Sequence, residues 1–287
     1  MTETAHDFSA LSMLPLPDTR PGVVYWRTLR DNLPGAVAWG LGYSVLIVVA
    51  TVLYPLLDKS NTVFTVLNGL GLLDSLSAGR NLEDVTGFAG YLALQAMSWG
   101  PLILAIYLIP QALRAIAQEE RQGTLDILLS TPISRWRLLV EKTLAIASSL
   151  ALILVIVWVS MLASTQALVD VDLEFTHTIA SIWHLMPISL VVLSATLLLS
   201  VTLREARKAG AIATLFVMVS YFVRALSDFT PTPLLLTLRQ ASIFSYYRSV
   251  AALGQGFQWA YDIPLLLLAG TLFGLAMVAF QRRDLGV

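Results

Sequence analysis

Long apolar runs with almost no charge are the feature that most restricts the fold of this chain. Residues 36–57, 88–113 and 143–169 contain no charged side chain. Crossing about 30 Å of hydrocarbon takes roughly 20 consecutive apolar residues, whereas a core helix of a soluble protein seldom keeps more than about 14 together. A mean hydropathy of +0.73 agrees with this length argument. The runs therefore predict membrane spans rather than a soluble core.

Three further runs complete the set. Residues 179–203 carry only His184 as a titratable group, residues 209–226 carry Arg224 near their end, and residues 263–281 are uncharged. Runs without strict alternation favour helices, because the strands of a membrane barrel alternate apolar and polar side chains. We therefore predict an all-α integral membrane protein with six transmembrane helices, built as a single domain over residues 1–287.

The distribution of basic residues predicts the orientation of these spans. An even number of spans places both termini on one side. Of the 18 Lys and Arg residues, that side carries Arg20, Arg27, Arg30, Arg114, Arg121, Arg135, Arg137, Lys142, Arg204, Arg207, Lys208, Arg282 and Arg283. Because basic loops stay in the cytoplasm, we predict a multi-pass protein of the cytoplasmic membrane with both termini cytoplasmic.

The composition also argues against several other classes of function. The chain has no cysteine, which excludes disulfides, thiolate catalysis and cysteine-ligated metals. No stretch matches the phosphate-binding pattern G-x-x-x-x-G-K-[ST], so we expect no ATP hydrolysis by this chain. Its first 20 residues lack the basic start and short apolar core of a signal peptide. We predict no cofactor, no metal and no nucleic-acid partner for this chain.

Two segments outside the spans mix apolar and charged residues. Residues 23–33 read VVYWRTLRDNL. They predict an amphipathic elbow helix in the headgroup plane, within a cytoplasmic N-terminus of residues 1–34, although a simple aromatic belt with arginines that fix topology is an alternative.

Residues 228–262 are too apolar for a solvated loop and too interrupted by charge and proline to span the membrane. We predict re-entrant or interfacial helices there, between spans five and six.

The stretch EERQGTLDILLSTPISRWRLLVEK, residues 119–142, concentrates charge between the second and third spans. Gly123 can end a helix that continues from the second span, and Thr124 can cap a short new one. Thr131 followed by Pro132 is typical of a second helix start. We predict a cytoplasmic helical hairpin whose leucines need cover, either from a partner protein or from the chain's own helices.

This stretch resembles the signature of ABC-2 type transporter permeases. The residues that carry the resemblance are Glu119, Glu120, Gly123, Thr124, Leu125, Leu128, Leu129, Thr131, Pro132, Ile133, Ser134 and Arg135. The ending FQRRDLGV also resembles the family's usual tail, and the similarity covers nearly the whole chain. One departure is Glu141, which stands where the family commonly has glycine before the lysine that begins span three.

The resemblance implies a permease subunit that works with separate ATPase chains. In the family, the hairpin is the coupling helix that docks on an ATPase, and two permease chains assemble with two ATPases that bind ATP and Mg²⁺. The ATPase-coupling residues here would be Glu119, Glu120, Gly123, Thr124, Leu125, Asp126, Leu128, Thr131, Pro132, Ile133, Ser134 and Arg135. The second permease chain would be an identical copy or a related paralogue, meeting spans one and five. The sparsely charged spans suit export of a small amphipathic or apolar substrate, drug-like or lipid.

Polar residues inside the apolar runs are candidates for a substrate path. They are Gln95, Ser98, Gln111 and Ser194, and for each of them helix packing is the alternative role. His177 and His184 have no carboxylate deep in the membrane near them in sequence, so we expect both near the outer surface. We expect Arg224 to reach lipid headgroups.

Two other classes of membrane protein remain as alternatives. An ion-coupled secondary transporter would normally place charged groups at the membrane midplane, and spans one to three and span six have none. An intramembrane enzyme would need a buried acid pair, a serine with a base or a metal site, and no run offers one.

Overall fold

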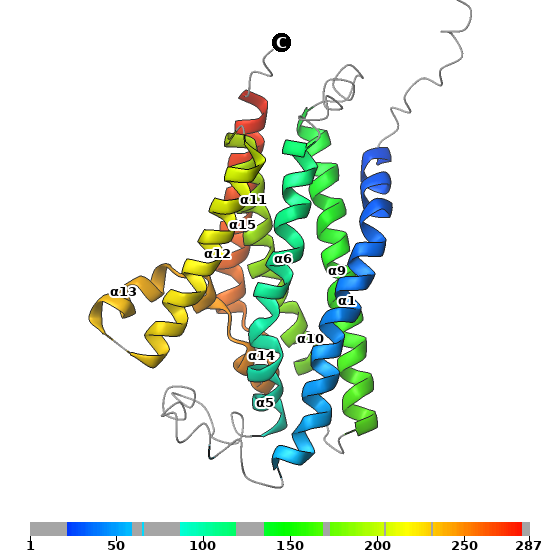
Figure 1. Cartoon of the computed structure of the whole chain (residues 1–287), viewed down its shortest axis with the longest axis vertical. Helices are drawn as coiled ribbons and strands as arrows, with labels where there is room; N and C mark the ends of the chain where they lie inside the picture. Colours follow the sequence, from blue (N-terminus) through cyan, green and yellow to red (C-terminus); the bar gives the residue numbers. More distant parts are fainter. Residues whose placement is uncertain are drawn as a thin grey trace, which may run out of the picture.

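The described part of the chain is a bundle of helices, seen in a computed structural model (Figure 1). The structure describes residues 22–58, 65, 87–118, 135–168, 173–203, 205–230 and 232–282. Within these ranges there is no strand, and six helical segments are long and apolar enough to cross a membrane. The predicted all-α membrane fold with six spans is therefore confirmed.

The helices follow one another along the chain in the order of the predicted spans. They are α1 (Val23–Asp58), α5 (Phe88–Gln95), η2 (Met97–Trp99), α6 (Gly100–Leu113), η3 (Arg114–Gln118), α9 (Arg135–Leu168), α10 (Phe175–Trp183), α11 (Leu185–Thr202), α12 (Ala206–Phe229), α13 (Pro233–Ala241), η4 (Ile243–Tyr246), α14 (Ser249–Gln255) and α15 (Trp259–Arg282). The most extensive packing joins α1 to α9, and α11 to both α15 and α6.

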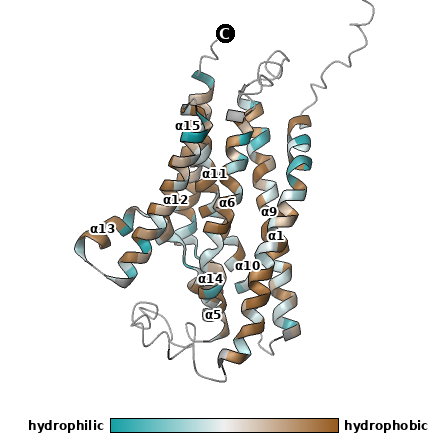
Figure 2. Ribbon diagram, viewed as in Figure 1, coloured by the Kyte–Doolittle hydropathy of each residue, from teal (hydrophilic) through white to brown (hydrophobic). Residues whose placement is uncertain are grey.

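The two ends of the bundle differ in what they carry. At one end α1 begins, η3 ends, α9 begins and α15 ends (Figure 1). We call this the hairpin end, because η3 and α9 flank the predicted hairpin there. The opposite end carries α5, α10 and α14. Figure 2 shows apolar residues along the helices and hydrophilic ones near the hairpin end of α1 and of α15, as expected for helices that cross hydrocarbon.

The second span is broken rather than continuous. It runs as α5, the 3₁₀ turn η2 and α6, and it finishes in the π-helix η3. Pro101 has no N–H to offer the carbonyl of Met97, and the N–H of Gly100 bonds that same Met97 carbonyl instead of the Ala96 carbonyl. Ser98 turns its hydroxyl back onto the carbonyls of Ala93 and Leu94. The break therefore follows from local residues that withhold α-helical donors.

The fourth span is divided in a similar way. Its two parts, α10 and α11, meet at His184, which has helical backbone angles but ends one helix and begins the next. Pro187 in the first turn of α11 provides no N–H for the carbonyl of Trp183. The side chain of His184 is consequently placed at a helix junction rather than on a regular helix face.

The prediction of a separate elbow helix was wrong. Residues 23–33 form the first part of α1, a single helix of 36 residues that continues through Pro34 and Pro55. The physical reason is a partner on α9: Glu141 accepts hydrogen bonds from the N–H groups of Gly22 and Tyr25. This anchor holds the start of α1 along α9 instead of letting it lie across the bundle.

Short helices between the fifth and sixth spans were predicted and are present. α13 projects sideways from the bundle (Figure 1) and buries none of its residues, whereas η4 and α14 pack into the bundle. α14 contacts α5 and α10, and η4 contacts α12 and α15. We call residues 243–255, which comprise η4 and α14, the cap, and the end of the bundle that they close the cap end.

The tight α1–α9 contact generates a prediction about two neighbouring glycines. A Cβ on Gly40 would lie 3.0 Å from the side chain of Ile156 on α9, whereas a Cβ on Gly42 would meet nothing within 4 Å. Gly40→Ala should destabilise the protein by about 1–3 kcal/mol through overpacking. Gly42→Ala should stabilise it by about 0.5–1 kcal/mol, because alanine loses less backbone entropy on forming a helix.

Thermal unfolding of the two purified variants in the same detergent measures this difference. The Gly40→Ala transition should lie below the wild-type transition and the Gly42→Ala transition at or above it. Equal transitions for both variants would mean that the α1–α9 contact is looser than the structure has it.

Candidate functional site

The residues predicted to couple to an ATPase lie almost entirely outside the described ranges. These are Glu119, Glu120, Gly123, Thr124, Leu125, Asp126, Leu128, Thr131, Pro132, Ile133 and Ser134. Arg135 is described as the first residue of α9, but its side chain is not. The structure does define the two helix ends on either side of the stretch, and these ends share an unusual set of contacts.

Lys142 connects the two helices that flank the hairpin. Its side chain is buried, with 3% of the residue exposed, and its Nζ donates to the carbonyl oxygen of Ala115 at 2.8 Å. Ala115 lies in the π-helix η3, where the wider i→i+5 turn interrupts the regular α-helical hydrogen-bond ladder. A charged lysine head therefore contacts a backbone carbonyl in the last turn before the hairpin.

Glu141 connects α9 to the start of α1. Its two carboxylate oxygens accept from Gly22 N at 3.1 Å and Tyr25 N at 3.2 Å, and Nε of Arg137 donates at 2.8 Å. The first N–H groups of a helix have no partner within it, and they attract negative charge. The hydroxyls of Tyr25 and Ser148 add a contact of 3.0 Å between the same two helices. We call Glu141, Lys142 and their partners the clamp.

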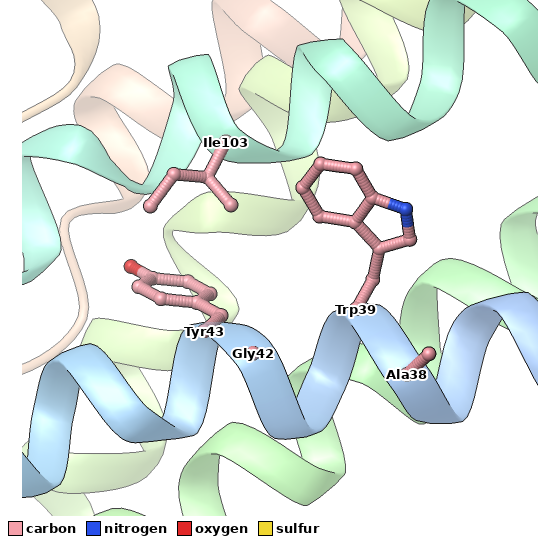
Figure 3. A pocket seen from close by; sticks show the side chains of 5 residues that line it. All are labelled: Ala38, Trp39, Gly42, Tyr43 and Ile103. Atoms are coloured by element: carbon pink, nitrogen blue, oxygen red, sulfur yellow. The ribbon is translucent and has the colours of Figure 1, made fainter.

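An apolar pocket opens between α1 and α6. Its volume is about 490 Å³, and it is lined by Ala38, Trp39, Gly42, Tyr43 and Ile103. Figure 3 shows Trp39 and Tyr43 projecting from α1 toward the helix that carries Ile103. No charged residue lines the pocket. The arrangement can hold an apolar or aromatic group but has no carboxylate or base for chemistry.

Tyr43 also belongs to the break in the second span. Its hydroxyl donates to the Ala96 carbonyl at 3.4 Å, the carbonyl that Gly100 N leaves without its α-helical donor. A Cβ on Gly100 would overlap that hydroxyl and would lie 2.6 Å from Leu185. Glycine is therefore required where α1 and α11 approach the start of α6.

The four predicted substrate-path residues do not line this pocket. Gln95 is exposed at the end of α5, Ser98 bonds carbonyls of its own segment, and Ser194 is buried in α11. Gln111 lies sixteen residues beyond Gln95, a rise of roughly 24 Å along a helix. A path through these four residues stays a prediction.

A polar cluster at the cap end was not anticipated from the sequence. His184 is fully buried, and its Nδ1 bonds Oδ1 of Asp262, which is also fully buried in the first turn of α15. In the sequence Asp262 falls in the link before the sixth span, where no partner for it is apparent. That His184 lies near the outer membrane surface stays a prediction; its burial against Asp262 was not anticipated, because helix junctions bring these two distant residues together.

Arg224 also differs from its expected role. Instead of extending to lipid headgroups, it donates to Asp228 from Nε at 3.2 Å and to the backbone carbonyls of Phe244 and Tyr247 from Nη1. Asp228 in turn pairs with Arg239 at 3.0 Å. One guanidinium and its carboxylate partner thus join α12 to α13 and to the cap. Within the described ranges, no group of three His, Cys, Asp or Glu residues could hold a metal ion.

Comparison with known protein families gives a match over most of the chain. A family model described as ABC-2 family transporter protein matches residues 23–285. No curated protein matches the chain. The matched range includes the clamp residues Glu141 and Lys142, the pocket, the cap and all six membrane-crossing segments.

The role of Glu141 in the clamp gives a direct prediction. Glu141→Ala removes the acceptor for two α1 amides and for Arg137, so it should loosen the start of α1 by about 1–2 kcal/mol, the usual cost of losing a helix cap. Glu141→Gln keeps an acceptor oxygen and should cost less. Hydrogen–deuterium exchange of the intact protein, read on the proteolytic fragment that covers residues 22–33, measures the loosening.

Glu205→Ala is the matched control for this prediction. Glu205 pairs with Lys208, and both side chains are more than half exposed, so its removal should change stability little. Exchange in residues 22–33 that is equally slow in wild type and Glu141→Ala would show that the clamp does not hold α1.

Proposed function

The chain belongs to the ABC-2 family of transporter proteins, and we propose that it is the permease subunit of an ATP-driven exporter powered by separate ATPase chains. The observation that carries the proposal is the family match over residues 23–285, which coincides with a bundle of six membrane-crossing segments. The chain itself lacks the phosphate-binding glycine–lysine pattern. ATP and Mg²⁺ would therefore bind to the partner.

We place the ATPase contact at the hairpin, residues 119–135. The clamp supports this placement, because α1, α6 with η3, and α9 are tied together beside the two ends of that stretch. A displacement applied between residues 118 and 135 would be shared by three spans rather than absorbed by one. Two ATPase chains, one for each hairpin of a permease pair, would complete the complex.

We propose that a second permease chain covers exposed apolar faces of α1 and α12. Leu41 and Val45 on α1 are 55% and 61% exposed, and Leu215 and Phe222 on α12 are 61% and 56% exposed. Lipid or a partner helix can cover such faces inside a membrane. The partner would be an identical chain or a related paralogue.

We propose that the hairpin end faces the cytoplasm, within the cytoplasmic membrane. Arg27, Arg30, Arg114, Arg207 and Arg282 all lie on the parts of their helices at that end. Basic residues near span ends favour the cytoplasmic side. In this orientation the cap closes the outer end of the bundle.

The apolar pocket supports a small apolar or amphipathic substrate. Its lining supplies aromatic faces and no charge, so it would select by shape and hydrophobic contact. A drug-like molecule or a lipid tail matches this chemistry, whereas a sugar or an inorganic ion does not.

Complex formation with an ATPase tests the proposed function. The chain would be co-expressed with a candidate ATPase encoded beside it and purified through a tag on the permease. We expect ATP hydrolysis to co-purify, and we expect Glu120→Arg with Pro132→Ala to reduce it about tenfold or more by reversing a charge and removing a helix-starting proline at the interface.

Thermal unfolding of the double variant separates lost coupling from misfolding, since both substitutions lie outside the described helices. Glu205→Ala should leave hydrolysis unchanged. A folded, monodisperse chain with which no ATPase associates would contradict the proposal and redirect attention to ion-coupled transport.

Filling the pocket tests the substrate class. In Gly42→Leu, half-maximal stimulation of ATP hydrolysis should need an apolar substrate at a concentration about tenfold higher. This change corresponds to a loss of about 1.4 kcal/mol in binding free energy. A Cβ at Gly42 meets nothing within 4 Å, and the rest of the leucine side chain would enter the pocket of about 490 Å³. Gly270→Leu is the matched control, because Gly270 on α15 also has open space but does not line the pocket. Equal responses of both variants would place substrate elsewhere.

A further inference from the structure

His184 is the point where three separate elements meet at the cap end. It lies at the α10–α11 junction, its Nδ1 bonds Asp262 of α15, and its Nε2 bonds the backbone N–H of Arg248 at 2.7 Å. Arg248 directly precedes α14 of the cap. The imidazole therefore bridges the bundle and the cap with its two ring nitrogens.

These two contacts define the protonation state of the ring. A backbone N–H can only donate, so Nε2 must accept with its lone pair and carries no proton. The ring proton is then on Nδ1, where it is donated to the Asp262 carboxylate. The structure thus holds the His184 ring as the tautomer with its proton on Nδ1 and the lone pair of Nε2 facing the cap.

The cap has additional contacts that depend on its being seated. The Tyr247 ring stacks on the His184 ring with centroids 5.1 Å apart, and its hydroxyl donates to the Met97 carbonyl at 2.8 Å. That carbonyl is the one Pro101 leaves without an α-helical donor. Seating of the cap consequently also supports the break in the second span.

We propose that His184 is the positioning residue of the cap, holding it closed when neutral and releasing it when protonated, with Asp262 as the partner that keeps the charged ring in the bundle. A protonated ring would direct an N–H from Nε2 toward the N–H of Arg248, so this bond would be lost. The bond to Asp262 would persist as an ion pair. Acid would thus remove the hydrogen bond that ties the start of α14 to the α10–α11 junction, while leaving that junction joined to α15.

Other charged and titratable groups lie on the elements around His184, and two of them also hold the cap: Arg224 through the Phe244 and Tyr247 carbonyls, and Arg248 through its contact with Tyr261. Asp262 and Tyr261 come from α15, Tyr247 and Arg248 from the cap, Tyr43 from α1 and Arg224 from α12; His177 and Glu174 pair near the start of α10. Arg248 places its guanidinium over the Tyr261 ring, 4.4 Å from the centroid. Burial raises the pKa of Tyr247, so its hydroxyl remains protonated across the relevant range.

The carboxylate of Asp262 is suited to receive a charged ring. Its Oδ2 atom is buried and has no hydrogen-bond partner among the described residues. A buried carboxylate is stabilised by a neighbouring positive charge. Protonation of His184 would supply that charge. The stronger contact between His184 and Asp262 would then offset part of the free energy lost when the hydrogen bond from Arg248 breaks.

Cysteine accessibility tests the proposal, because the chain has no native cysteine. Ala252→Cys puts a reporter at a fully buried position of α14, and Leu234→Cys puts a reference thiol on exposed α13. Each single-cysteine chain is purified without a partner and labelled with maleimide. The labelling rate at the reporter is divided by the rate at the reference thiol, because the thiolate fraction of both changes with pH. We expect this ratio to rise about tenfold between about pH 7.5 and about pH 5.5, which bracket the usual imidazole titration.

Two variants separate titration of His184 from general loosening. His184→Gln can donate to Asp262 and accept from Arg248 but cannot be protonated, so its reporter should stay protected at both pH values. His177→Gln should keep the wild-type response. A pH response that persists in His184→Gln, or one that disappears in His177→Gln, would overturn the proposal.

Asp262→Asn provides a second measurement that does not alter the histidine. Removing the negative charge makes protonation of His184 less favourable, so the labelling transition should move to lower pH by about one unit or more. An unchanged transition would contradict the assignment. Because the test uses the permease chain alone, its result is independent of whether an ATPase binds.

Discussion

The structure depends on finding a partner for every backbone group that a broken helix leaves without one inside a membrane. At the break in the second span, the Met97 and Ala96 carbonyls lose their regular donors through Pro101 and Gly100. They receive hydroxyls from Tyr247 of the cap and Tyr43 of α1. In hydrocarbon an unpaired carbonyl costs several kcal/mol. The Met97 carbonyl accepts from Gly100 as well as from Tyr247, so the Tyr43 hydroxyl, which replaces the donor lost at Ala96, is the contact on which the break depends most.

The same requirement explains the clamp at the other end of the bundle. There the groups to be satisfied are the first N–H groups of α1 and a carbonyl in the π-helical turn η3, and the side chains that satisfy them are the adjacent residues Glu141 and Lys142. Their adjacency on α9 makes them point to different neighbours, α1 and η3. One turn of α9 thus fixes two other spans beside the predicted hairpin.

Much of the fold could be predicted from the sequence, because uncharged runs of about twenty residues leave few alternatives to membrane helices. Glu141 stands out in the sequence only as a departure from glycine in a family pattern; its capping role depends on α1 lying along α9, which no local pattern reveals. Asp262 stands at the end of the predicted re-entrant or interfacial segment, and its pairing could not be predicted for the same reason, since its partner His184 is 78 residues away. The pocket combines four residues of α1 with Ile103 of α6 and has no sequence signature. Contacts across the bundle could not be predicted from the sequence, and neither could the continuation of residues 23–33 into α1, which depends on such a contact.

The helix α1 is the element that touches the clamp, the pocket and the break in the second span. Gly22 and Tyr25 near its start reach the clamp, and Tyr43 both lines the pocket and bonds the break. Coupling between two sites requires an element whose arrangement both sites bias. A ligand that displaces the Tyr43 ring would remove a donor from the Ala96 carbonyl, and a pull on Glu141 would act on the same helix about five turns away.

The packing of α1 between these two points decides how a displacement would travel. Gly40 packs closely on Ile156 of α9, so α1 cannot shift at the clamp or at the pocket without altering its contact with α9. Under the proposed function, a displacement at the hairpin would therefore reach the pocket along α1, by movement of a packed helix rather than by a chain of side chains.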